Sequence, residues 1–214
     1  MPLAFDARGL VPVIVQDHLT GEIRMLAFAT DEAVKKTLES GQATFWSRSR
    51  GELWQKGLSS GNAIQVLRVL VDCDADTLVY QGEPSGNSCH TGQPTCFFRE
   101  IDGGALKAYL GQQTLLATLE AVLEARKAAT AVASYTKSLY EGGAAAIGEK
   151  IREEAAELAV AVDRENDERV ISEAADTLYH LLVGLRWRAI PFRRVLAELA
   201  RRLGKSGHEE KASR

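Results

Sequence analysis

Three cysteines are the most chemically distinctive residues of this 214-residue chain, and all of them lie in two short segments rich in other metal ligands. Cys73 stands among the aspartates of Asp72–Asp76, and Cys89 is followed by His90 and then by Cys96. An odd number of cysteines cannot all pair as disulfides within one chain. Buried thiols that only fill space would have no reason to lie among carboxylates and a histidine, so the pattern predicts a metal centre.

The aspartates follow an apolar, β-branched segment, residues 64–71, which has the composition of a β-strand. Side chains alternate between the two faces of a strand, so a continued strand would place the three aspartates on one face and Cys73 on the other. Carboxylates suit Mg²⁺ and thiolates suit Zn²⁺, so the end of one strand can serve two metals. The predicted magnesium ligands are Asp72, Asp74 and Asp76, and the predicted zinc ligands are Cys73, Cys89 and Cys96.

Three thiolates leave a tetrahedral zinc ion one ligand short, and an open position is typical of a catalytic zinc that carries a water molecule. Such a water can reach a pKa of about 7, which makes it a nucleophile at neutral pH. His90 is either the fourth ligand, a general acid or base, or a histidine that only stabilises its turn. We favour the acid or base role, because its neighbour Cys89 makes it awkward for both residues to bind one zinc.

A polar segment between two predicted strands contains groups that suit a phosphorylated substrate. The candidate substrate contacts are Trp46, Arg48, Arg50, Lys56, Ser60 and Asn62. Arg48 and Arg50 lie two residues apart and can share one face of an extended chain, while Lys56 adds a further positive charge. Trp46 can stack on a purine or simply pack against the sheet. From the residues alone, a phosphate cradle and a solvated basic loop explain this segment equally well.

The first hundred residues carry the signals of a small domain in which strands predominate. A helix is expected to begin after Thr30, a good N-cap residue, and to end near Gly41. The predicted strands are Val11–Gln16, Ile23–Ala29, Thr44–Ser47, Ile64–Asp72, Leu78–Gln81 and Phe97–Ile101. Asp102, Gly103 and Gly104 then break the chain, and the remainder is rich in alanine, leucine, glutamate and lysine, which favours helices.

Acidic residues on two predicted helices of the second half can converge on Mg²⁺. They are Glu153, Glu154, Glu157, Glu173 and Asp176. The expected apolar stripe of the first helix is Ile151, Ala155, Leu158 and Val162, and that of the second includes Ile171, Leu178, Leu181 and Leu182. Glu154 stands at helical spacing from the first stripe, where a carboxylate needs a partner. Antiparallel helices can bring such carboxylates together around a metal, although exposed glutamates on alanine-rich helices give the same pattern.

Several motifs of the first half occur together in a characteristic order. They are Phe45-Trp46-Ser47-Arg48-Ser49-Arg50, Leu53-Trp54-Gln55-Lys56-Gly57, Ser60-Gly61-Asn62, the D-C-D-x-D segment and the C-H-T-G-x-x-x-C segment. In these motifs the chain resembles phosphoribosyl-AMP cyclohydrolase, an enzyme family of histidine biosynthesis. The resemblance implies magnesium on the three aspartates, zinc on the three cysteines, and a homodimer in which Cys73 is shared with the partner chain. Leu58 and Ser59 stand where the family pattern has glutamate and threonine.

The helical half has its own set of motifs. They are Ser134-Tyr135-Thr136-Lys137-Ser138-Leu139-Tyr140, the E-E-x-x-E segment of Glu153–Glu157, Glu173-Ala174-Ala175-Asp176 and Leu178-Tyr179-His180-Leu181-Leu182. In these motifs, residues 113–203 are similar to phosphoribosyl-ATP pyrophosphohydrolase, an all-α nucleotide pyrophosphatase. The resemblance implies catalytic roles for two acids, Glu154 and Glu157. It also implies substrate contacts from Ser134, Tyr135 and Lys137, while Arg152 replaces a glycine that is common before the paired glutamates.

Charge and composition argue against several other classes of protein. The formal net charge is −3, and the sequence contains no long stripe of basic residues. Both observations argue against nucleic-acid binding. The first residues show no secretory signal, and no apolar stretch is long enough to cross a membrane. We therefore expect a cytoplasmic protein whose cysteines are reduced and available to metal.

The sequence thus predicts a multidomain α+β protein with two hydrolase activities. Residues 1–108 would form a small, β-rich, dimeric metal domain, residues 113–203 an all-α helical bundle, and residues 204–214 a polar tail. The helical domain would use Mg²⁺ to hydrolyse phosphoribosyl-ATP to phosphoribosyl-AMP and pyrophosphate. The first domain would then open the adenine ring with zinc-activated water. The alternative is a general nucleotide pyrophosphatase with a zinc-stabilised, non-catalytic N-terminal binding module.

Overall fold

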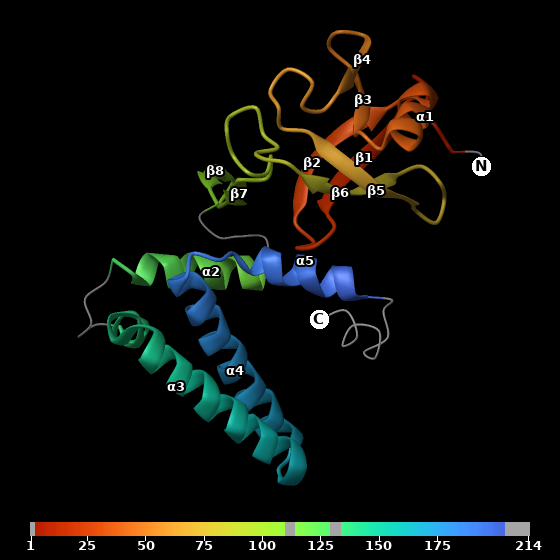
Figure 1. The fold of residues 1–214 in the computed structure, drawn as a ribbon. Helices are drawn as coiled ribbons and strands as arrows, with labels where there is room; N and C mark the ends of the chain where they lie inside the picture. The colour runs from red at the N-terminus through yellow and green to blue at the C-terminus, as the bar shows by residue number, and fades with distance from the viewer. Residues whose placement is uncertain (1–2, 110–113, 129–133, 204–214) are drawn as a thin grey trace. The chain divides into compact units, whose positions relative to one another are not determined.

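A computed structural model describes residues 3–109, 114–128 and 134–203 of the chain (Figure 1). Contacts divide the chain into two compact units, Met1–Thr114 and Leu115–Arg214, and each unit has its own hydrophobic core. The predicted polar tail, residues 204–214, lies outside the described residues, as does residue 113 at the predicted start of the helical domain. Among the described residues, no helix combines the length and the apolar character that a membrane crossing requires.

A six-stranded sheet dominates the first unit (Figure 1). Its strands are β1 (Val11–Asp17), β2 (Ile23–Ala29), β3 (Thr44–Ser47), β4 (Glu52–Gln55), β5 (Ile64–Val71) and β6 (Leu78–Pro84), in the spatial order β4-β3-β2-β1-β6-β5. β1 and β6 are parallel, and all other neighbours are antiparallel. The strand predictions are confirmed for β1, β2, β3, β5 and β6. β4 was not predicted; it is recognised as a strand by its pairing with β3.

One helix, α1 (Asp31–Ser40), covers the sheet beside β3 and β2. Thr30 accepts a hydrogen bond from the backbone N–H of Ala33, and Gly41 ends the helix at φ 69°. Both predicted helix boundaries are therefore confirmed. The core of this unit combines alternate residues of β1, two residues of α1 and apolar residues from the rest of the sheet: Val11, Val13, Val15, Met25, Ala29, Ala33, Val34, Ala43, Phe45, Ile64, Val66, Leu78 and Tyr80.

A two-stranded hairpin, β7 (Arg99–Asp102) and β8 (Ala105–Ala108), follows the six-stranded sheet in the chain. Gly103 and Gly104 form its turn with φ angles of 57° and 81°, which glycine adopts without steric cost. The break that we predicted at Asp102–Gly104 is thus a hairpin turn inside the first unit. The change to helical structure comes at Leu115.

The described part of the second unit consists of helices, as predicted (Figure 1). They are α2 (Leu115–Arg126), α3 (Tyr135–Arg164), α4 (Asp167–Trp187) and α5 (Phe192–Arg202). Ser134 caps α3, and Asn166 caps α4 immediately after α3 ends, so α3 and α4 form a helix hairpin. Gly143, at φ 64° and ψ −157°, interrupts α3 after its first two turns.

The faces that α3 and α4 turn toward each other differ from the predicted stripes. On α3 the buried line runs through Ile147, Glu154 and Ala161, whereas the predicted Val162 is 67% exposed. On α4 the buried residues include Glu173 and His180. Ala155 of the first predicted stripe, and Ile171, Leu178 and Leu181 of the second, are likewise exposed. Apolar spacing therefore predicted the two stripes only in part: Leu182 is fully buried and Ile151 packs against the core, but the interface also buries carboxylates and a histidine that the pattern did not include.

Candidate functional site

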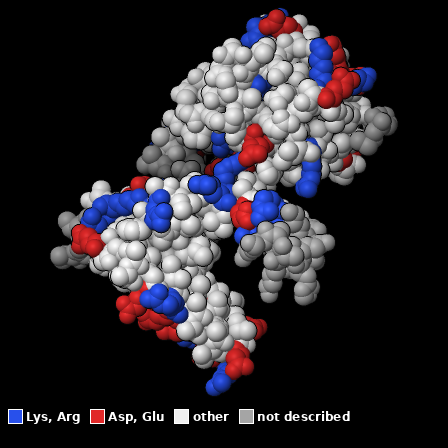
Figure 2. Space-filling view, viewed as in Figure 1, with Lys and Arg blue, Asp and Glu red and all other residues white. Residues whose placement is uncertain are grey.

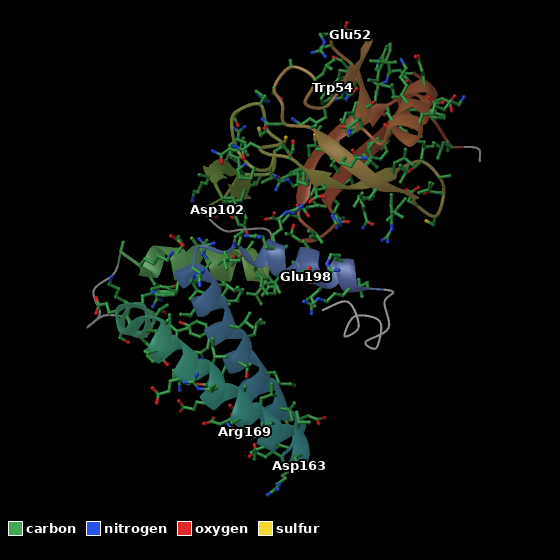
Figure 3. The ribbon with its side chains drawn as sticks, in the orientation of Figure 1. Glu52, Trp54, Asp102, Asp163, Arg169 and Glu198 are labelled. Atoms are coloured by element: carbon green, nitrogen blue, oxygen red, sulfur yellow. The ribbon has the colours of Figure 1, made fainter. Side chains whose placement is uncertain are left out.

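A cavity of about 610 Å³ in the first unit brings several predicted residues together. Its walls come from β4, the loop after it and the loop that carries Cys89. The lining residues are Arg50, Glu52, Leu53, Trp54, Gln55, Lys56, Gly57, Leu58, Ser59, Ser60, Asn62, Cys89, His90 and Gly92. Figure 3 labels Glu52 and Trp54 on β4, the strand that sequence reasoning missed. The cavity therefore depends on a strand that only tertiary pairing with β3 reveals.

Cys89 lines this cavity, and its thiol interacts with that of Cys96. Burial alone would raise the pKa of Cys89, but hydrogen bonds from Thr91 and Cys96 and the charge of Lys56 lower it. Cys96 is exposed as a residue, but partial desolvation of its thiol and the proximity of Cys89 raise the pKa of Cys96 to about 11. The Cys96 thiol thus hydrogen-bonds to the sulfur of Cys89, and each thiol affects the ionisation of the other. A soft cation would allow both to ionise, so this donor pair fits zinc.

Lys56 supplies the positive charge beside the thiols. The residue is 8% exposed, and burial lowers the pKa of its ammonium group while both cysteines oppose that effect. The loop after it turns at Gly57, at φ 87°, where an added Cβ would lie 2.3 Å from the backbone nitrogen of Ala63. Only glycine fits there, so this position fixes the path of the loop that carries Ser60 and Asn62.

Arg24 anchors the cysteine loop, and sequence reasoning missed it. Its guanidinium donates to the carbonyl oxygen of Gly86 at 3.1 Å and lies 3.3 Å from the hydroxyl of Ser88. The backbone N–H of Cys96 donates to the carbonyl oxygen of Arg24 at 2.9 Å. Arg24 is 8% exposed. The sequence did contain a signal for Arg24, because a charged residue stands there inside an otherwise apolar strand. Burying such a charge is costly unless it is fully paired.

The predicted magnesium ligands lie in a turn. Our expectation that they share one face of a continued strand was therefore wrong. β5 ends at Val71, and the Asp72 carboxylate accepts hydrogen bonds from the backbone N–H groups of Asp76 and Thr77 at 3.0 and 3.1 Å. Ala75 has a φ of 64°, so alternation along a strand cannot continue through this segment. Even so, ligand atoms of the three exposed aspartates Asp72, Asp74 and Asp76 lie within 4.8 Å of one another. The turn achieves the convergence that we had assigned to a strand face, and the donor set fits Mg²⁺.

Cys73 is exposed in this turn, with its sulfur 4.0 Å from a carboxylate oxygen of Asp74. In the part of one chain that the structure describes, the three cysteines do not form a group within reach of one metal ion. Cys89 and Cys96 therefore form a pair without Cys73 in a single chain.

The other predicted substrate contacts divide into two sets. Lys56, Ser60 and Asn62 line the cavity beside the predicted catalytic His90, as does Arg50, which pairs with Glu52 at 2.5 Å. Arg48 instead lies over the ring of Phe28, 3.9 Å from its centre, and Trp46 pairs across the sheet with Phe28 and Leu53. Neither Arg48 nor Trp46 is among the cavity-lining residues.

The second unit holds an acidic cluster between α3 and α4. Ligand atoms of Glu154, Glu157 and Glu173 lie within 4.8 Å of one another. Glu154 and Glu173 are 8% and 3% exposed, and Glu157 is exposed. Two further predicted acids, Glu153 and Asp176, are exposed and lie outside this group. Two buried carboxylates and one accessible carboxylate form a donor set that fits Mg²⁺.

Two cations balance the acidic cluster from its edge, and Figure 2 shows acidic and basic side chains side by side over this helix pair. The Lys150 ammonium lies 2.8 Å from Glu154 and 3.0 Å from Glu153, and these hydrogen bonds raise its pKa. Arg169, labelled on α4 in Figure 3, lies 2.6 Å from Glu173. Burial raises the pKa of Glu173, and the charge of Arg169 opposes that effect. Arg169 was not predicted, because nothing in its spacing separates it from a surface arginine.

The three predicted substrate contacts at the start of α3 have different surroundings. Ser134 is buried and accepts from the backbone N–H of Lys137, and the Lys137 ammonium donates to the carbonyl oxygen of Lys127 at 2.9 Å. Ser134 and Lys137 thus link the start of α3 to α2. Tyr135 instead contacts α4, with its hydroxyl 3.1 Å from Nε2 of His180.

Comparison with known protein families matches both halves of the chain. Residues 25–98 match the model of phosphoribosyl-AMP cyclohydrolase, and residues 116–203 match that of phosphoribosyl-ATP pyrophosphohydrolase. The first match spans the cavity and the cysteine loop, and the second spans the acidic cluster.

Single proteins resemble nearly the whole chain. The histidine biosynthesis bifunctional protein HisIE of Aquifex aeolicus is 43% identical over 203 residues, which cover 94% of this chain and 98% of that protein. The proteins of the same name from Wolinella succinogenes and Halalkalibacterium halodurans are 40% and 41% identical. Those two alignments cover 98% and 94% of this chain, and 95% of each relative.

Proposed function

Because the chain belongs to the family of bifunctional histidine-biosynthesis proteins, and is both a phosphoribosyl-AMP cyclohydrolase and a phosphoribosyl-ATP pyrophosphohydrolase, we propose that each of its two units holds one active site. The observation that carries this proposal is the separation of two ligand sets. The cavity with its thiol pair belongs to the first unit, and the acidic cluster belongs to the second. We assign the cyclohydrolase to residues 1–108 and the pyrophosphohydrolase to residues 113–203. Family membership decides against a non-catalytic N-terminal module.

In the pyrophosphohydrolase, Glu154, Glu157 and Glu173 would hold Mg²⁺, with Asp176 one helical turn from Glu173 as a further acid. When bound, the metal supplies positive charge that neutralises the triphosphate and favours attack by water. Glu157 is the accessible member of the cluster, so it is the group that accepts a proton from the attacking water. Water adds to the α-phosphorus of phosphoribosyl-ATP, and pyrophosphate leaves. Lys150, already at the edge of the cluster, contacts the phosphates.

In the cyclohydrolase, Cys89 and Cys96 would hold zinc together with Cys73 of the partner subunit. This homodimer is supported by the position of Cys73, which lies apart from the thiol pair within one chain. When bound, zinc supplies a Lewis acid that lowers the pKa of water. His90 lines the same cavity and is exposed, so it can take a proton from the water and deliver one to the leaving nitrogen. The water oxygen ends on C6 of the adenine ring, the N1–C6 bond breaks, and N1 gains a proton.

The remaining polar groups of the cavity bind the substrate. Arg50 and Lys56 provide positive charge, and Ser60 and Asn62 provide hydroxyl and amide groups for phosphate and ribose. Mg²⁺ on Asp72, Asp74 and Asp76 would add a second cation to this unit. Trp54, half-buried against Phe45, offers a ring on which the purine can stack.

The substitution Cys89→Ser tests the assignment of the two sites. With phosphoribosyl-ATP as substrate, the variant should release pyrophosphate at the wild-type rate, accumulate phosphoribosyl-AMP and contain less zinc. Both products are measured by chromatography, and zinc by elemental analysis of the purified protein. Undiminished ring opening in a zinc-depleted variant would refute the zinc site, and loss of both activities in a folded variant would refute two separate sites.

A further inference from the structure

The second unit contains a buried polar network that neither proposed site has used. Its centre is His180 of α4, which is 5% exposed and has a partner at each ring nitrogen. Nδ1 lies 2.9 Å from the backbone carbonyl oxygen of Asp176, and Nε2 lies 3.1 Å from the hydroxyl of Tyr135. A buried histidine with both nitrogens engaged is held in a single orientation.

The direction of both hydrogen bonds follows from the carbonyl group. A carbonyl oxygen can only accept a hydrogen bond. Nδ1 of His180 therefore carries a proton and donates it to the backbone carbonyl oxygen of Asp176. In the neutral imidazole Nε2 is then an acceptor, and the Tyr135 hydroxyl donates to it. His180 thereby fixes both the position of the Tyr135 hydroxyl and the direction of its proton.

A second contact beside this one ties the same two segments together. The hydroxyl of Tyr179 lies 2.6 Å from that of Thr136, and the ring of Tyr179 meets the ring of His180 edge to face. Consecutive residues of α4 therefore bind consecutive residues in the first turn of α3. Because Gly143 interrupts α3, that first turn does not take its orientation from the part of the helix that carries Glu154. Contacts with α4, together with the contacts of Ser134 and Lys137 with α2, position it instead.

The imidazole also borders the acidic cluster. Nδ1 of His180 lies 3.7 Å from a carboxylate oxygen of Glu154, too far for a hydrogen bond but close enough for the ring to limit where that carboxylate can move. One buried side chain thus lies against both Glu154 and Tyr135. Tyr135 itself is 52% exposed, so its ring remains accessible while its hydroxyl is anchored.

We infer that His180 is a positioning residue of the pyrophosphohydrolase site, which orients Tyr135 toward the nucleotide substrate beside Glu154. His180 itself is buried behind these two side chains and does not reach the reacting atoms. This inference rests on the proposed function of the acidic cluster and deepens it. It assigns the accessible ring of Tyr135 to substrate binding, and its hydroxyl to the link with α4.

A double-mutant cycle on the full chain tests this inference. The variants are His180→Phe, Tyr135→Phe and the combination of both, and the readouts are kcat and KM for pyrophosphate release from phosphoribosyl-ATP. Each single variant should raise KM about three- to tenfold, the effect of losing one hydrogen bond, and should change kcat less. The double variant should match the single ones, because both substitutions break the same bond. Ring opening of supplied phosphoribosyl-AMP should be unchanged in every variant.

Three further variants separate positioning from general stability and from the proposed site itself. His180→Gln should restore KM, because its carboxamide oxygen can accept from Tyr135. Tyr179→Phe is the matched control: it removes the neighbouring hydrogen bond to Thr136 but leaves the bond between His180 and Tyr135, so it should lower the melting temperature and raise KM clearly less than His180→Phe does. Additive effects in the cycle, or an equal rise of KM in Tyr179→Phe, would overturn the role of His180. Wild-type turnover in Glu154→Gln would refute the acidic site, and the inference about His180 with it.

Discussion

Replacing Glu154 by glutamine should remove one activity of this bifunctional enzyme while leaving the protein folded. The side chain is 8% exposed, and its carboxylate is one of the three that lie within 4.8 Å of one another. Glutamine has nearly the same shape but carries no charge. Loss of one metal-binding carboxylate should lower kcat/KM for pyrophosphate release by more than about 100-fold, or about 2.7 kcal/mol of transition-state stabilisation.

The effect of the same substitution on stability should be small. Glu154 loses its ion pair with Lys150, but the lysine side chain is 26% exposed and keeps Glu153 at 3.0 Å. An ion pair exposed to that degree contributes about 1 kcal/mol or less, and relief of repulsion within the cluster opposes its loss. The free energy of unfolding should therefore change by less than about 1 kcal/mol.

The assay supplies each substrate separately to one preparation of the protein. Pyrophosphate release from phosphoribosyl-ATP reports the second unit, and ring opening of phosphoribosyl-AMP, followed by ultraviolet absorbance, reports the first. Glu149→Gln, an exposed glutamate on the same helix outside the cluster, is the matched control. Pyrophosphate release at more than a tenth of the wild-type rate by Glu154→Gln would refute the assignment of this cluster.

Two further predictions concern the independence of the units and the two metals of the first unit. Residues 113–214 expressed alone should release pyrophosphate and residues 1–108 alone should open the ring, because each unit has its own core; a folded but inactive fragment 113–214 would contradict a self-contained helical site. Cys73→Ala should lose zinc, ring opening and dimer stability while it keeps pyrophosphate release, whereas Asp74→Asn should keep its zinc and need more Mg²⁺ for ring opening. Elemental analysis and sedimentation of the two variants check this, and equal zinc loss in both would exclude separate metals.

Some features could be read from the sequence because they depend on local chemistry. Thr30 and Gly41 mark the ends of α1 through a side-chain cap and a left-handed glycine, and both effects act over a few residues. The change from strands to helices likewise follows from composition. The ordered motifs around Lys56 and Cys89 indicated the family, and the comparisons bear that out.

Other features depended on neighbours distant in the sequence. β4 is a strand because it pairs with β3, and Asp72–Asp76 is a turn because backbone N–H groups bind the Asp72 carboxylate. The alternating pattern of the preceding strand could not reveal where that strand ends. The turn still brings the aspartates together, so the convergence of these three side chains was easier to predict than the backbone that presents them.

The sequence by itself determined which groups this protein brings to its chemistry: three thiols, an aspartate cluster and paired glutamates on helices. Only the tertiary structure decided which of them meet. Glu154 and Glu173 come together because both are buried where α3 packs against α4, at positions that the predicted apolar stripes did not include. Arg24 and His180 act through partners tens of residues away in the chain, at Gly86 and Tyr135. A local pattern carries no information about such partners, because their contacts form only when separate elements pack together.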